Sequence, residues 1–299
     1  MFNASALTLL ASLHAMTPTV NAATMFTQAP TASAAAGQSD NLEPDRPDVT
    51  NGTHIVDVGV VQMEVGGLWS RGPGTHSVGT PVTARVGLTD WLEARVGADG
   101  YLSVTDVVGI HRGMGNVQIA AKLRLWADHG GVPVLSILPT VNLPAASESN
   151  GLGSGQADFT IAMLTGTDLL TRGHLDINYG VGRIGAGTGL PRFTQHLVSL
   201  SVSAEVPGPA TPYLEGFWFS RQDPDGGPVA ALDAGAIYVI TPRLALDGGL
   251  QVGLTDAAPS LSAFGGLSIA LGNILGDHGV HARQRQAARR GAARAAKAR

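Results

Sequence analysis

The chain has 299 residues, of which only 14% are charged and 40 are glycine, with no cysteine and a formal net charge of −4. Soluble proteins usually carry about 25% charged residues and about 7% glycine, so this composition argues against an ordinary helical enzyme. The absence of cysteine excludes disulfides and thiolate metal sites. The weak net charge makes nucleic acid an unexpected partner for the body of the chain.

The first 43 residues are expected to be a leader followed by a linker. Residues 6–16 form a short apolar core, and Val20-Asn21-Ala22 resembles a secretory cleavage site, although the usual basic start is missing. We therefore expect a signal peptide over 1–22, with a disordered Ala-rich leader as the alternative. Residues 23–43 are rich in Ala, Thr and Ser without periodicity, which predicts a flexible linker. Downstream, no run of 18 apolar residues occurs, which excludes a transmembrane helix.

Residues 42–52, LEPDRPDVTNG, place four charges among two prolines. Proline lacks the backbone N–H and biases the preceding residue towards extended conformations, so neither a helix nor a central strand is expected here. Asp45, Arg46 and Asp48 lie close to the leader and form no motif with a histidine or a second acidic cluster, which argues against catalysis. We interpret them as a charged entry to the first strand, at the periplasmic mouth of a barrel, where Arg46 can pair with carboxylates of the lumen.

From His54 to Leu271 apolar and polar residues alternate with a period of two, which is typical of β-strands. The alternating segments run to about ten residues, the length that a tilted strand needs to cross a bilayer, and exceed the five or six usual in soluble sheets. We expect an all-β fold, an antiparallel up-and-down transmembrane β-barrel of about twelve strands. The expected strands lie near 54–69, 77–88, 90–102, 113–126, 132–143, 155–166, 173–184, 193–206, 211–220, 229–240, 243–254 and 260–271.

The charged residues of these strands are expected to face the lumen, because an Arg or Lys on the lipid face costs about 2 to 4 kcal/mol at the membrane midplane. Both signs occur on neighbouring strands, so ion pairs across the lumen are expected, in an open channel or a packed polar interior. Alternation alone does not say which face is inside, so a soluble barrel with its charged face outward stays open. The lumen candidates are Arg85, Glu93, Arg95, Asp99, Lys122, Arg124, Asp176, Arg183, Glu205, Asp233, Arg243 and Asp247.

Four short motifs follow one another in the first half of the barrel: DRPD at 45–48, GLTDWLEAR at 87–95, GMGNVQIAAKLRL at 113–125 and PTVNLPAAS at 139–147. In these motifs the chain resembles the bacterial outer-membrane barrel transporters of the "MetA-pathway of phenol degradation" type. The resemblance implies a barrel in the outer membrane of a Gram-negative bacterium, with a role in the uptake of aromatic or other hydrophobic compounds and no catalytic residues. Such barrels commonly end on a strand with a terminal aromatic residue, whereas 28 residues follow Leu271 here.

Motifs for other chemistry are weak. GVGRIG at 180–185 matches the dinucleotide-binding pattern, but AGTGLPR follows it instead of a helix. DPDGG at 223–227 lacks the later ligands of a calcium loop and fits a turn. No HExxH or GxSxG motif occurs. We therefore expect no enzyme activity, no cofactor and no metal site.

The barrel with its entry segment is expected to span 44–272, followed by a basic tail over 273–299. The tail is expected to be a solubilising extension, with contact to anionic headgroups as the alternative. The expected function is passive passage of small solutes, hydrophobic or aromatic ones among them, with outer-membrane lipid as the surrounding partner. A structural barrel without transport and a soluble ligand-binding barrel are the alternatives, and the oligomeric state stays open.

Overall fold

The computed structural model describes residues 42, 44–46, 49–128, 132–169 and 172–273. The expected signal peptide, almost all of the linker and the basic tail from residue 274 lie outside these residues, as does Asp48. In the described part of the chain, no helix is long and apolar enough to cross a membrane.

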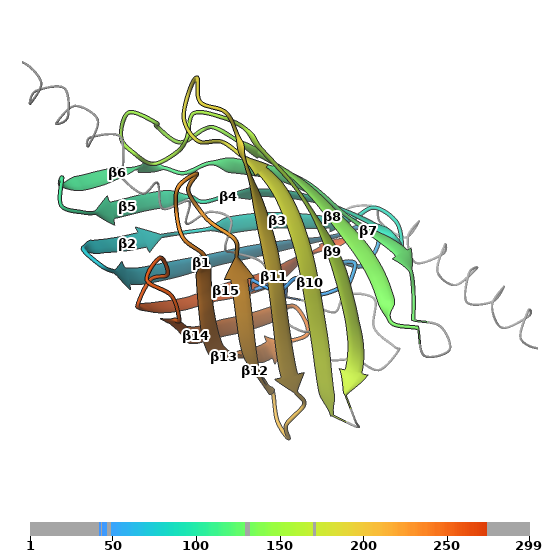
Figure 1. Cartoon of the computed structure of the whole chain (residues 1–299). Coiled ribbons are helices and arrows are strands. Elements are labelled where there is room, and N and C mark those ends of the chain that lie inside the picture. The colour runs from blue at the N-terminus through green and yellow to red at the C-terminus, as the bar shows by residue number, and fades with distance from the viewer. Residues whose placement is uncertain (1–41, 43, 47–48, 129–131, 170–171, 274–299) are drawn as a thin grey trace, which may run out of the picture.

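Fifteen strand segments form one antiparallel sheet that closes on itself where β15 pairs with β1 (Figure 1). Three pairs of segments, β2 with β3, β4 with β5 and β6 with β7, are each one long strand with a two-residue interruption. The predicted all-β, antiparallel barrel of twelve strands is therefore confirmed. The segments are β1 Val60–Gly72, β2 Thr75–Gly79, β3 Val82–Gly87, β4 Leu92–Ala98, β5 Tyr101–Thr105, β6 Ile110–Met114, β7 Val117–Trp126, β8 Val134–Leu143, β9 Asp158–Leu169, β10 Gly173–Ile184, β11 Phe193–Ala204, β12 Ala210–Phe219, β13 Val229–Thr241, β14 Leu244–Gly253 and β15 Leu261–Asn273.

The three interruptions lie side by side in neighbouring strands. Thr80 N donates to Tyr101 O at 3.0 Å, and Gly115 N donates to Gly100 O at 2.8 Å, so backbone hydrogen bonds continue across them. Gly100 has φ +63°, and a Cβ there would lie 2.0 Å from Thr80 O, so this position requires glycine. Each interruption in β4–β5 and β6–β7 adds a residue, so side chains beyond it change face.

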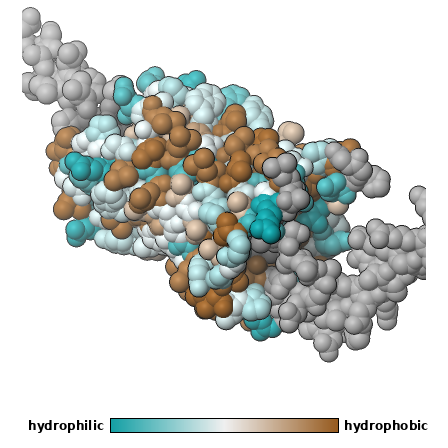
Figure 2. All heavy atoms as spheres, turned by 90° about the horizontal axis from the view of Figure 1, so that it is seen from below, coloured by the Kyte–Doolittle hydropathy of each residue, from teal (hydrophilic) through white to brown (hydrophobic). Residues whose placement is uncertain are grey.

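The two faces of the barrel differ sharply in polarity. Outward positions carry exposed apolar side chains such as Ile161, Met163, Leu214 and Leu250, and Figure 2 shows apolar residues spread over the outer surface. Inward positions carry the buried charged and polar side chains, such as Glu93. The charged face is thus the inner one, the opposite of what a soluble barrel with a charged exterior requires.

The two ends of the barrel differ in the length of their connections. β1 begins and β15 ends at the same end, because Val60 pairs with Asn273. The opposite end carries the longer loops, and the loop between β8 and β9 packs there against the β5–β6 hairpin through Leu102, Val104, Ala146 and Leu152. Connections at the first end are mostly shorter, such as 88–91 and 242–243, whereas those at the opposite end include 144–157, 185–192, 220–228 and 254–260.

The first strand begins later than expected. Residues from His54 were predicted to be strand, but β1 begins at Val60. The preceding residues lie inside the barrel, where Val49, Thr50 and Val56 are buried. The backbone N–H groups of Val49 and Val56 bond to side chains of the barrel wall, and Val58 forms an isolated β-bridge with Gly87 of β3. We call the described residues 42, 44–46 and 49–58 the entry segment.

Candidate functional site in the barrel lumen

The entry segment crosses the lumen and is attached to the wall at several points. Asp45 makes the first attachment, with its side chain 1% exposed. Its carboxylate pairs with Arg85, with Arg95 Nη2 at 2.5 Å and with Lys122 Nζ at 3.4 Å. Its backbone N donates to Glu64 Oε1 at 3.0 Å. Asp45 therefore meets three cations of the wall through its carboxylate and one acid through its backbone N–H.

The wall residues around Asp45 also pair with one another. Arg85 bonds Glu64 Oε1 at 2.9 Å through Nη1 and Glu93 Oε1 at 2.9 Å through Nε. Arg95 Nε lies 2.6 Å from Glu93 Oε1. Asp45, Glu64, Glu93, Arg85, Arg95 and Lys122 form what we call the ion network, in which three carboxylates balance three cations. Buried charges need such pairing, because the cost of removing them from water is otherwise several kcal/mol per ion.

Arg46 makes a second contact on the other side of β1. Its Nε lies 3.4 Å from Asp247 Oδ2, and Nη2 donates to Gly265 O at 3.2 Å. A Cβ at Gly66 would lie 2.0 Å from Arg46 Nη2, and one at Gly266 would lie 2.5 Å from Nε. The guanidinium therefore occupies space that these two glycines leave open.

The middle of the segment is held by neutral donors. Val49 N donates to Glu215 Oε2 at 2.8 Å, and both Thr50 N and Thr50 Oγ1 donate to Glu215 Oε1. Asn51 N donates to Asn178 Oδ1, and Asn178 Nδ2 donates back to Asn51 O at 2.8 Å. Glu215 lies in β12 and Asn178 in β10, so these contacts fix the segment to the wall opposite the ion network.

The last part of the segment, which leads to β1, is also bonded to the wall. Lys122 Nζ donates to Gly52 O at 2.8 Å, Ser136 Oγ donates to Thr53 O at 3.2 Å, and Val56 N donates to Glu93 Oε2 at 2.8 Å. Burial, together with the positive charges of Arg124, Lys122 and Arg85, lowers the pKa of the His54 imidazole well below its ordinary value. The segment thus fills part of the lumen as a hydrogen-bonded plug with a neutral histidine.

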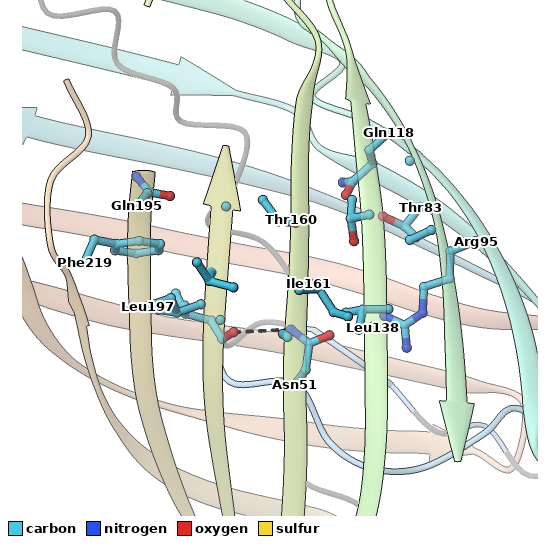
Figure 3. Close-up of a pocket in the computed structure, with 18 residues that line it drawn as sticks. Asn51, Thr83, Arg95, Gln118, Leu138, Thr160, Ile161, Gln195, Leu197 and Phe219 are labelled. Atoms are coloured by element: carbon cyan, nitrogen blue, oxygen red, sulfur yellow. Dashed lines mark hydrogen bonds between the residues drawn. The ribbon is translucent and has the colours of Figure 1, made fainter. Parts of the chain in front are cut away.

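A cavity of about 100 Å³ remains beside the plug (Figure 3). Its wall joins apolar side chains with groups that can form hydrogen bonds, and Val49 and Asn51 of the entry segment form one side. Arg95 of the ion network also borders it. Apart from Asn51, the labelled side chains in Figure 3 come from β3, β4, β7, β8, β9, β11 and β12, and include Thr83, Gln118, Leu138, Thr160, Gln195, Leu197 and Phe219.

The structure places most of the residues predicted to line the lumen on the inner face. Five of them contact the entry segment: Arg85, Glu93, Arg95, Lys122 and Asp247. Asp99 accepts a bond from Asn116 N at 2.8 Å at the strand interruption, and Asp233 lies opposite Glu215. Of the remaining two inner residues, Asp176 lies beside His174, and the half-buried Arg124 donates to Asp90 O and adds positive charge near His54 of the plug.

Three predicted lumen residues lie elsewhere. Arg183 is exposed on the outer face of β10, because alternation from the buried Asp176 puts every odd-numbered residue of this strand outside. Glu205 follows the last residue of β11 and is exposed in the turn. Arg243 is likewise exposed, in the turn before β14. The prediction thus assigned Arg183 to the wrong face of its strand and counted Glu205 and Arg243, which lie just outside β11 and β14, as strand residues.

Sequence reasoning missed Glu64, Glu215 and Asn178 as attachments of the plug. Glu64 alternates with Val65 and shares its face with the buried Gln62, so its inward position is readable from the sequence. Glu215 shares its face with Tyr213, Phe217 and Phe219, which is the part of the wall that meets the entry segment. In the described part of the chain, no group of three or more His, Asp or Glu residues could hold a metal ion.

Comparisons with known proteins agree with this architecture. An outer membrane channel from Pseudomonas putida F1 superposes with a TM-score of 0.58 at 14% identity, covering 73% of this chain and 98% of that one. The NanC porin superposes with a TM-score of 0.50 at 13% identity, covering 70% and 100%. No curated protein matches in sequence. The family model described as "Putative MetA-pathway of phenol degradation" matches residues 44–271, so the chain belongs to this family, as its four motifs predicted.

Proposed function

We propose that this barrel is an outer-membrane channel that passes small solutes with an apolar or aromatic part when its entry segment moves aside. The observation that carries the proposal is the cavity beside the plug, where Leu138, Leu197 and Phe219 face Thr160 and Gln195. Such a mixed lining suits a small molecule with one apolar and one polar end, because apolar walls bind and a few polar groups orient. The similarity to an outer membrane channel supports the same reading.

In this proposal the entry segment acts as the gate of the channel. Its contacts reach β1, β4, β7, β8, β10, β12 and β14, so a solute can follow the lumen only if some of them break. The attachment at Glu215 and Asn178 lies next to the cavity, because Val49 and Asn51 border it. Release on that side would widen the cavity while Asp45 stays in the ion network.

Liposome swelling with two matched glucosides tests the proposal. Phenyl β-glucoside is larger than methyl β-glucoside, so a simple sieve passes it more slowly, whereas the proposed channel passes it at least as fast. The cavity-filling variant Ala120→Trp should slow phenyl glucoside several-fold. Its control is Ala121→Trp, since Ala121 is the next residue of β7 and faces outward.

A barrel without transport is the second candidate, and the closely bonded plug favours it. The same assay separates the two functions when it is run on the natural chain and on Asp45→Ala, which weakens the plug. Swelling with neither glucoside in either protein would establish the structural role. Faster entry of methyl glucoside, unaffected by Ala120→Trp, would show an unselective pore.

A further inference from the structure

The outward positions of the described strands contain no Asp or Glu residue. Their only permanent charges are three arginines, Arg71 in β1, Arg112 in β6 and Arg183 in β10. All three are exposed, and none forms an ion pair with another described residue. They also share one end of the barrel, the end opposite the start of β1. The membrane-facing side of this end therefore carries an excess of positive charge, at these three positions.

Arg183 belongs to a small group of side chains on adjacent strands. Phe159 of β9 and Thr194 of β11 are its direct neighbours across the sheet. Arg183 Nη1 donates to Thr194 Oγ1 at 2.9 Å, which holds the guanidinium against the surface. Arg192 lies over the Phe159 ring at 5.6 Å from its centroid, and its Nε donates to Ala157 O at 3.0 Å. Two guanidinium groups thus flank one exposed aromatic ring.

The level of this group along the barrel follows from strand geometry. Gly173 and Arg183 mark the two ends of the outer face of β10, ten residues apart. At about 3.3 Å per residue and a tilt of about 40°, they are separated by about 25 Å along the membrane normal, the height of the apolar band of such barrels. Outward residues between them, such as Ile177 and Tyr179, are exposed. Arg183 therefore lies at the membrane surface, where a charge costs little.

We propose that Arg183 and Arg192 bind a phosphate group of lipid A, the lipopolysaccharide anchor in the outer leaflet, with an acyl chain along Phe159 and Ile161. A guanidinium presents paired N–H donors that match phosphate oxygens, and no described carboxylate competes for them. The group faces the outer leaflet because short turns mark the periplasmic end of outer-membrane barrels and long loops the extracellular end. The site does not depend on whether a solute passes through the lumen.

Binding of defined lipids to the purified full-length protein, followed by native mass spectrometry, tests this site. The probes are bisphosphorylated lipid A, the same lipid without phosphates, and phosphatidylglycerol as a second anionic lipid. The natural chain should retain bisphosphorylated lipid A in preference to both others. The double variant Arg183→Glu/Arg192→Glu should retain it at least tenfold less.

The matched control is Arg172→Glu, because Arg172 is exposed in the turn at the opposite end of β10. It should leave lipid A retention unchanged, and heat-dependent gel mobility should show that every variant is folded. Equal retention of lipid A with and without phosphates would overturn the proposal, as would equal retention by the double variant. Retention of phosphatidylglycerol at the level of lipid A would show that the site binds any anionic lipid. Displacement of lipid A by millimolar inorganic phosphate would show that the site binds the free ion. A double variant that changes only the oligomeric state would show a contact between copies instead.

Discussion

The two sides of the lumen hold the same segment by different means. On the side of β1, β3, β4 and β7, Asp45 enters a network in which every charge has a partner of opposite sign. On the side of β10 and β12, Glu215 and Asn178 bond backbone and hydroxyl groups, and no described Arg or Lys pairs with Glu215. The cavity borders the second side through Val49 and Asn51. We therefore expect the ion network to act as the anchor of the segment, and the contacts at Glu215 and Asn178, beside the cavity, to break first.

Removal of the Asp45 carboxylate should have the largest effect on the seating of the entry segment. Asp45→Ala leaves Arg85, Arg95 and Lys122 buried with an excess of positive charge, and breaking a buried pair in this way costs about 3 to 5 kcal/mol. We expect the entry segment to leave the lumen and the conductance in planar bilayers to rise. Asp225→Ala, in an exposed loop, is the control. Unchanged conductance in a folded Asp45→Ala barrel would show that the anchor is not at Asp45.

A methyl group added beside the Arg46 guanidinium should have the next largest effect on the seating of the entry segment. Gly66→Ala places a Cβ 2.0 Å from Arg46 Nη2, so the guanidinium must move and its contact with Asp247 is lost. Overpacking of this kind costs about 1 to 3 kcal/mol. Gly67→Ala is a matched control, because a Cβ at this neighbouring outward position meets nothing within 4 Å. Protease cleavage of the entry segment should accelerate in the first variant only.

The second attachment should tolerate change better. Glu215→Gln keeps the shape of the side chain but presents an amide N–H₂ group to Val49 N, so one hydrogen bond is lost. The loss of one such bond costs about 1 kcal/mol. We expect a rise in open probability that stays well below the rise in Asp45→Ala. A rise equal to that in Asp45→Ala would remove the distinction between anchor and releasable contact.

Acid should weaken the plug slightly through His54. A released His54 takes up a proton below pH of about 6.5, whereas the lowered pKa keeps the seated imidazole neutral, so proton uptake favours release. The contribution is absent at pH 7.5 and grows as pH falls, reaching about 0.8 kcal/mol, or about fourfold in the release equilibrium, at pH 6. The same titration of His54→Gln supplies the baseline. Identical pH profiles for both proteins would rule out His54 as the titrating group.

Much of the barrel could be predicted from local sequence, because lipid outside and charge inside impose a strict period of two. The wall residues Glu93, Arg95 and Lys122 follow directly from that period. The path of the entry segment could not be predicted, because residues 54–58, HIVDV, are as rich in β-branched residues as a strand, and it is contacts with distant wall residues that keep them inside. The four motifs of the family supply Asp45, Glu93, Arg95 and Lys122, yet sequence order alone does not show that these side chains meet.

The attachment of Arg46 also bears on the order of assembly. Its partners, Asp247 and the Gly265 carbonyl, are 201 and 219 residues away in sequence, on the last two strands. Asp45 can contact β1, β3 and β4, through its backbone and its side chain, as soon as these strands pair. The Arg46 site exists only after β14 and β15 have joined the sheet and β15 has closed onto β1. The entry segment can therefore lock completely only in a finished barrel, which makes its seating a marker that the last strands have been inserted correctly.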